Sequence, residues 1–216
     1  MKERQRLFSR INSIFLMLCG PLSIALAVYY LFTGNVSHCL LSIVTLLWLA
    51  IPYLLQRIHP FRLGQLQLFS YYLFILSSYV LGQVLTCNAR FPVYDAIVHG
   101  YSGFFFCLLA VSIFCFYTKT RHSTVPYFFC STFCICFSLA VFVLLELVQI
   151  FHCAHIAHAQ YMLSTALLHV LFWLLGIVVF VVLTALKRFR KIHTYPLYTY
   201  EDFCVLNIKS SVTILS

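Results

Sequence analysis

The sequence predicts an all-α fold, a polytopic membrane bundle of six transmembrane helices with both termini in the cytoplasm. Three observations support this prediction. The chain has 216 residues, of which 62% are hydrophobic and 9% charged, whereas a soluble domain carries about 25% charged residues. The apolar residues form six continuous runs, and the basic residues gather at one set of their ends.

Each apolar run is long enough to cross roughly 30 Å of hydrocarbon as a helix. Barrel strands are excluded because the runs show no alternation of polar and apolar residues. The predicted spans are residues 12–33, 38–56, 66–86, 94–117, 126–151 and 161–186. They form one transmembrane domain over 12–186, between a basic cytoplasmic N-terminus, 1–11, and a basic cytoplasmic tail, 187–216.

The N-terminus also has features of a cleaved signal peptide, since a basic segment and an apolar run precede the small residues Ala25-Leu26-Ala27. The apolar stretch continues beyond this point through Tyr29 and Tyr30 to Phe32, which is longer than the apolar core of a signal peptide. We therefore expect the first span to be retained. The short connection Gly34-Asn35-Val36-Ser37 then predicts an antiparallel hairpin with the second span.

The basic residues set the orientation, because cytoplasmic loops carry the excess of Lys and Arg. One side of the predicted topology holds only Arg90. The same bias predicts contact with anionic lipids at the cytoplasmic face. It does not indicate nucleic-acid binding, because no soluble module remains. The other side holds thirteen basic residues: Lys2, Arg4, Arg6, Arg10, Arg57, Arg62, Lys119, Arg121, Lys187, Arg188, Arg190, Lys191 and Lys209.

Ionisable side chains inside three spans are the candidate site, because such residues in a membrane mark functional positions. The predicted topology puts them at similar depth near the outer surface, and pairs spaced by three or four residues share a helix face. We expect one polar ligand-binding pocket that opens outward. A structural alternative is that Asp95 caps the fourth span and His99 satisfies a neighbour. The candidates are Asp95, His99, Glu146, Gln149, Thr165 and His169.

Two segments carry a resemblance to known families. The segment from Asp95 through His99 to Gly103 resembles the Asp-x3-His-x3-Gly motif of VanZ-like proteins and related YjdF-type bacterial membrane proteins. The segment from Glu146 to Phe151 resembles the Glu-x2-Gln-x-Phe motif of the same families. Of their third motif, Asp-x3-Asn-x2-Gly-x3-Gly, only the last glycine is present, as Gly176. The resemblance implies a multi-pass protein of the bacterial plasma membrane with a role in the cell envelope.

Other functions are compatible with the same residues. A small proton-coupled transporter would use Asp95, Glu146 and His169 as proton-exchanging groups, and an enzyme would use them as acid and base. Gly100-Tyr101-Ser102-Gly103 fits the Gly-x-Ser-Gly motif of rhomboid proteases, with His169 where their base resides. Against a protease, the segment from Val170 to Trp173 is too bulky for the close helix approach that rhomboids need. The sequence assigns no catalytic residue.

A second, weaker site lies in the connection between the last two spans. His152, His155 and His158 are spaced by three residues, and imidazole is a ligand for zinc and copper. The alternative is a polar connector with incidental histidines, which we favour. We expect no cofactor, and the chain is compatible with a homo-oligomer.

Overall fold

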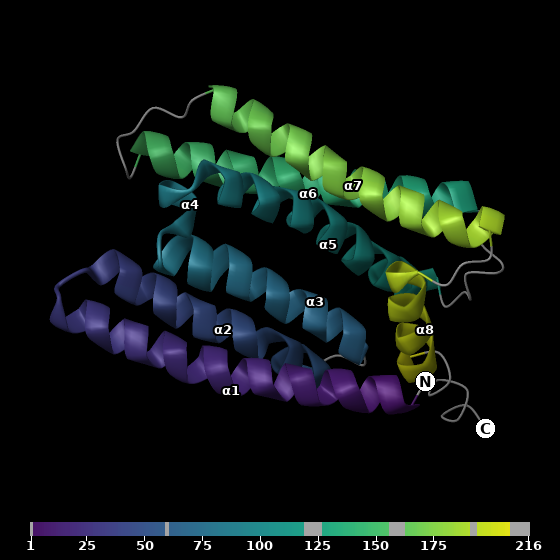
Figure 1. Ribbon diagram of the computed structural model, residues 1–216, viewed down its shortest axis with the longest axis horizontal. Coiled ribbons are helices and arrows are strands. Elements are labelled where there is room, and N and C mark those ends of the chain that lie inside the picture. Colours follow the sequence, from purple (N-terminus) through teal and green to yellow (C-terminus); the bar gives the residue numbers. More distant parts are fainter. Residues whose placement is uncertain (1, 59–60, 119–126, 156–162, 191–193, 208–216) are drawn as a thin grey trace. The chain divides into compact units, whose positions relative to one another are not determined.

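The computed structural model of the protein contains helices and no strand among the residues that it describes (Figure 1). The all-helical class that the apolar runs predict is therefore confirmed for this part of the chain. The chain divides into two compact units, residues 1–95 with 199–216 and residues 96–198. The described residues are 2–58, 61–118, 127–155, 163–190 and 194–207.

Five helices in the described part of the chain are long and apolar enough to cross a membrane. Each overlaps one of the predicted spans, so these five predicted helices are confirmed, although the first begins at Lys2, within the predicted N-terminal segment 1–11. Many of their large apolar side chains are exposed, as is expected of helices whose outer surface faces lipid. The five are α1 (Lys2–Phe32), α2 (Val36–Ile58), α5 (Pro92–Thr118), α6 (Tyr127–His155) and α7 (Leu163–Arg190).

The remaining predicted span, 66–86, is not one regular α-helix. It consists of α3 (Gln65–Ile75) and η1 (Leu76–Val84), a π-helix that continues it. A nearby donor stabilises the change of hydrogen-bond pattern, because the Tyr94 hydroxyl donates to the Ser77 carbonyl at 2.7 Å. The helix ends before Thr86, whose φ of 60° is left-handed, and a short turn, α4 (Cys87–Arg90), leads to α5.

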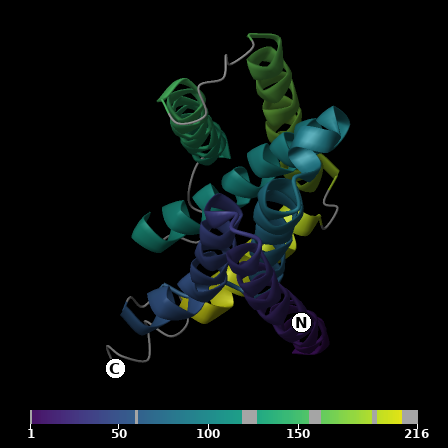
Figure 2. The same cartoon turned by 90° about the vertical axis from the view of Figure 1, so that its left-hand side faces the viewer.

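In the first unit, α1 and α2 form the antiparallel hairpin that the short connection predicts (Figure 1). Figure 2 shows the hairpin from the side of its connecting turn. Gly34 takes a φ of +73°, which glycine adopts without strain. The Asn35 N–H donates to the Tyr30 carbonyl at 2.9 Å, and the Asn35 side chain accepts from the His38 N–H at 3.3 Å. Asn35 thus closes one helix and caps the next.

The first unit also contains an ion pair that sequence reasoning missed. Asp202 of α8 (Tyr195–Asn207) is 1% exposed, and its carboxylate lies 3.2 Å from the Arg4 guanidinium of α1. Gly64 allows α8 to pack closely here, because a Cβ atom at this position would lie 3.0 Å from the Asp202 Cβ. The sequence places Arg4 and Asp202 in two cytoplasmic tails and gives no signal that they meet.

In the second unit, α5 and α7 cross at glycines. A methyl group at Gly176 would overlap the Gly100 carbonyl, and one at Gly103 would overlap the Trp173 carbonyl. Small residues let two membrane helices bring their backbones together in this way. The expectation that Phe172 and Trp173 prevent a close approach is therefore wrong, because the small residues lie on α5 and one turn further along α7.

We predict that Arg4→Met lowers the thermal midpoint of the purified protein, because it leaves the buried Asp202 carboxylate without its ion-pair partner. The expected loss is roughly 2 kcal/mol. Arg6→Met, on the exposed side of the same helix, is the matched control and should leave the midpoint unchanged. Equal midpoints for the two variants would show that the ion pair does not stabilise the protein.

Candidate functional site

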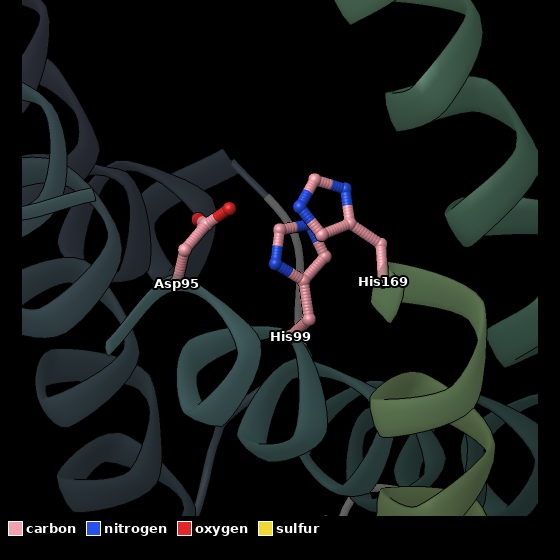
Figure 3. Close-up of side chains that lie close together, drawn as sticks. All are labelled: Asp95, His99 and His169. Carbon is pink, nitrogen blue, oxygen red and sulfur yellow. The ribbon is translucent and has the colours of Figure 1, made fainter. Parts of the chain in front are cut away.

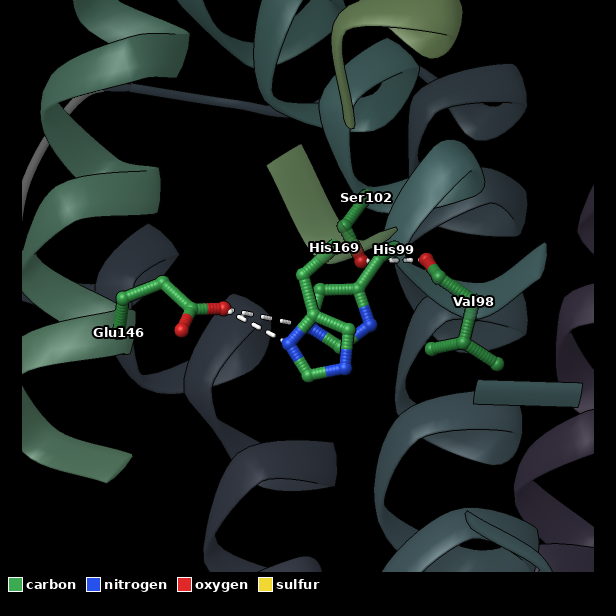
Figure 4. Close-up of polar contacts among 5 residues, drawn as sticks. All are labelled: Val98, His99, Ser102, Glu146 and His169. Carbon is green, nitrogen blue, oxygen red and sulfur yellow. Dashed lines mark hydrogen bonds and ion pairs between the residues drawn. The ribbon is translucent and has the colours of Figure 1, made fainter. Parts of the chain in front are cut away.

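Three side chains from three helices of the second unit meet around one carboxylate oxygen (Figure 4). Glu146 of α6 presents Oε1 to the Nδ1 atom of His169 of α7 at 3.0 Å. The same Oε1 lies 3.8 Å from the Nε2 atom of His99 of α5. The structure therefore brings together three of the six residues that the sequence nominates, each from a different apolar helix.

These side chains face the interior of the unit, as helix periodicity allows. Glu146 is 9% exposed, whereas its neighbours Leu145 and Leu147 are 44% and 56% exposed. His169 is 1% exposed and Leu171 is 64% exposed. The apolar neighbours thus occupy the outer surface of α6 and α7, and the ionisable groups are removed from it. A buried carboxylate in such surroundings requires a polar partner, which His169 supplies.

The two imidazole rings are stacked on each other. Their centroids are 3.7 Å apart and their planes differ by 9°. An ionised carboxylate only accepts hydrogen bonds, so the 3.0 Å contact assigns the proton to Nδ1 of His169. The stacked rings place donor atoms from α5 and α7 beside one acidic group.

The glycine crossing explains why His99 and His169 can stack. His99 immediately precedes Gly100, whose Cβ would lie 3.3 Å from the Phe172 carbonyl of α7. The close contact between the two backbones therefore begins on α5 at the residue next to His99, and on α7 it extends to Gly176. Because α5 and α7 cannot move apart without losing this packing, the two histidines have a fixed separation at their Cα atoms.

A second polar contact joins the three helices beside the cluster. It involves Trp173, one turn after His169 on α7, and Ser138 of α6. The Trp173 Nε1–H donates to the Ser138 hydroxyl at 3.0 Å, and that hydroxyl donates to the Gly103 carbonyl at 3.1 Å. This chain joins α7, α6 and α5. Sequence reasoning treated Trp173 only as a bulky side chain and did not predict this link. A serine inside the apolar run 126–151 indicates a polar contact between helices but does not identify its partner.

Asp95 lies one turn before His99 on α5, in the first turn of that helix (Figure 3). The boundary between the two units falls directly after Asp95, but α5 is one continuous helix, so its geometry fixes Asp95 relative to His99. One ligand atom from each of Asp95, His99 and His169 lies within 4.8 Å of the others. An acidic residue here also interacts favourably with the helix dipole, as the structural alternative states.

The other candidate residues are placed differently. Gln149 and Thr165 are half-buried on α6 and α7, and the described part of the chain gives neither a side-chain hydrogen bond. His152 and His155 fall in the last turn of α6, and His158 lies outside the described residues. The metal site suggested for these three histidines stays a prediction.

Ser102, the serine of the Gly-x-Ser-Gly match, is buried, and its hydroxyl donates to the Val98 carbonyl of its own helix at 2.7 Å (Figure 4). Among the described residues, this hydroxyl makes no hydrogen bond to an imidazole. A serine nucleophile requires a base within hydrogen-bond reach. The contacts of Ser102 therefore give no support to a serine protease.

We predict that Gly176→Ala disrupts the site by pushing α7 away from α5, because the added methyl group has no room beside the Gly100 carbonyl. Overpacking of this kind costs about 1–3 kcal/mol or more, and the thermal midpoint in detergent should fall accordingly. Gly20→Ala in α1 is the matched control, because nothing lies within 4 Å of its added Cβ. If both variants melt like the wild type, the glycine crossing does not hold the site together.

Comparison with known proteins gives one result. No curated protein and no solved structure matches the chain. A family model described as "Predicted membrane protein (DUF2238)" matches residues 14–166, more than two thirds of the chain. The matched segment includes Asp95, His99 and Glu146 and ends before His169. The chain therefore belongs to this family of predicted membrane proteins.

Proposed function

We propose that the protein is a six-span protein of the bacterial plasma membrane that binds a small polar or lipid-linked ligand at the cluster of His99, Glu146 and His169. One observation supports this function above others: a single carboxylate oxygen, buried among apolar helices, faces imidazoles from two other helices at 3.0 and 3.8 Å. Ionisable groups inside a membrane protein are costly, and their convergence from separate helices is typical of ligand sites.

The family resemblance supports the same location. The two motifs that resemble VanZ-like and YjdF-type proteins contribute His99 and Glu146, which lie on different helices and about 47 residues apart in the chain. His169 comes from the segment where those families carry a different motif. We infer that this chain keeps a common envelope role in its first two motifs and has its own residue at the third position.

The topology that we propose has six spans and both termini in the cytoplasm. Five spans are the long helices, and α3 and η1 together form the remaining one, which is third in chain order. The basic residues support this orientation, thirteen on one side against Arg90 on the other. It brings the start of α5, the end of α6 and the start of α7 toward the outer surface, where envelope ligands are found. It also brings Arg57 and Arg62 to the cytoplasmic face, where we propose contact with anionic lipids.

The test is a deletion strain complemented with wild-type or variant protein and exposed to wall-targeting antibiotics. We expect the deletion to change sensitivity, the wild type to restore it, and Glu146→Gln to fail. The neutral amide of this variant would lose the charge-assisted hydrogen bond to His169, a loss of about 1.5–3 kcal/mol. Glu201→Gln on α8 is the matched control and should complement fully.

Two outcomes would reject this function. If Glu146→Gln, present at wild-type level in the membrane, complements as well as Glu201→Gln, the cluster has only a structural role. If purified protein in proteoliposomes instead moves a solute in response to a pH gradient, and envelope phenotypes are absent, the transporter alternative replaces the envelope role.

A further inference from the structure

We propose that Asp95, His99 and His169 bind one divalent transition-metal ion, with Glu146 orienting His169 for this purpose. The proposal rests on the proposed function for the location of the site and adds a metal ion to it. One donor atom from each of the three residues lies within 4.8 Å of the others (Figure 3). The site is separate from the histidines at the end of α6 that the sequence nominates.

The donor set determines the class of ion. Two imidazoles and one carboxylate are ligands typical of zinc, iron and other first-row transition metals, whereas magnesium and calcium prefer oxygen alone. Around a tetrahedral zinc ion, donor atoms with bonds near 2.0–2.1 Å are about 3.4 Å apart. Side-chain rotation must therefore shorten the spacing of the donor atoms, which lie within 4.8 Å of one another, before they bind one ion. Three protein ligands leave one coordination position for water or a further ligand.

Glu146 takes the position of an outer partner of the metal ligands. Histidines that coordinate a metal usually donate the other ring N–H to a carboxylate, which fixes the tautomer and the ring orientation. His169 makes this contact, since Nδ1 lies 3.0 Å from Glu146 Oε1. With Nδ1 engaged, Nε2 is the atom through which His169 would coordinate. The buried hydrogen bond is thus the arrangement that a metal-binding histidine requires.

The charge of the cluster also fits a divalent cation. The cluster places two acidic side chains, Asp95 and Glu146, beside two imidazoles. A carboxylate in apolar surroundings is costly unless opposite charge lies near it. A divalent cation at this position would lower that cost.

Metal binding requires one change of side-chain geometry. The lone pair of an imidazole nitrogen lies in the ring plane, so two stacked rings cannot both point at one ion, and one of them must turn. His99 is the ring with room to do so, because its side chain is 18% exposed while that of His169 is 1% exposed and hydrogen-bonded. The glycine crossing keeps the two Cα atoms in place while the ring turns.

The experiment measures zinc in the purified full-length protein after removal of any affinity tag, loading with zinc chloride and desalting. We expect about one zinc ion per chain for the wild type. Asp95→Asn, His99→Gln and His169→Gln should each abolish stoichiometric binding. Glu146→Gln keeps all three ligands but loses their orienting charge, so zinc affinity should fall about 10–100-fold.

Two controls separate this site from other histidines. His38→Gln carries the same substitution in α2 and should retain zinc. The triple variant His152→Ala, His155→Ala, His158→Ala should also retain it. Zinc contents are compared only among variants whose thermal midpoint equals that of the wild type. A second measurement needs no variant: cobalt bound to the wild type should show the absorption bands of a nitrogen- and oxygen-ligated ion.

The proposal is wrong if the wild type binds neither zinc nor cobalt, or if the triple variant loses the metal while His99→Gln keeps it. Its failure differs from failure of the proposed function. Absent metal with an envelope phenotype that depends on Glu146 rejects only the metal. Stoichiometric metal without that phenotype rejects only the envelope role and leaves a structural metal site.

Discussion

A carboxyl group inside an apolar helix bundle is stable only where other polar groups surround it, and the arrangement of α5, α6 and α7 follows from this constraint. Glu146 is buried while the leucines on either side of it are exposed. Its partners are imidazoles from the other two helices. Rotating any one helix outward would place an ionisable group against hydrocarbon, which costs several kcal/mol, about the same order as the net stability of a domain. The polar contact therefore fixes the rotation of all three helices.

The contact also depends on how closely α5 and α7 approach. Gly100 and Gly103 of α5 meet the backbone of α7, and Gly176 of α7 meets the backbone of α5. This packing holds His99 over His169. The hydrogen bonds of Ser138 to Gly103 and Trp173 attach α6 to the same two helices. The glycines have no functional side chain, but they set the distance between α5 and α7 and therefore between His99 and His169. A metal or polar ligand held between α5 and α7 would consequently need little movement of the backbone.

The sequence predicts much of this arrangement because composition and periodicity report on each helix separately. Long apolar runs specify the helices, and an ionisable residue within a run identifies a site candidate, as for His99, Glu146 and His169. Neither signal specifies which helix faces meet. The role of Gly176, the Ser138 link and the ion pair of Arg4 with Asp202 therefore could not be found, since each depends on contacts between distant segments. The π-helix after Ile75 was hidden for a similar reason, because Tyr94, seventeen residues beyond Ser77, donates to the Ser77 carbonyl there.

The central claim is that Glu146 and His169 are hydrogen-bonded inside the membrane. Solid-state nuclear magnetic resonance of the protein in lipid bilayers tests it directly, through the dipolar coupling between the Glu146 carboxyl carbon and the Nδ1 nitrogen of His169. We predict a measurable coupling, because the 3.0 Å separation of Nδ1 from Oε1 keeps the carboxyl carbon near this nitrogen. A coupling at the noise level, in protein that is folded by its spectrum, would contradict the account, because the two helices would then not share a polar centre.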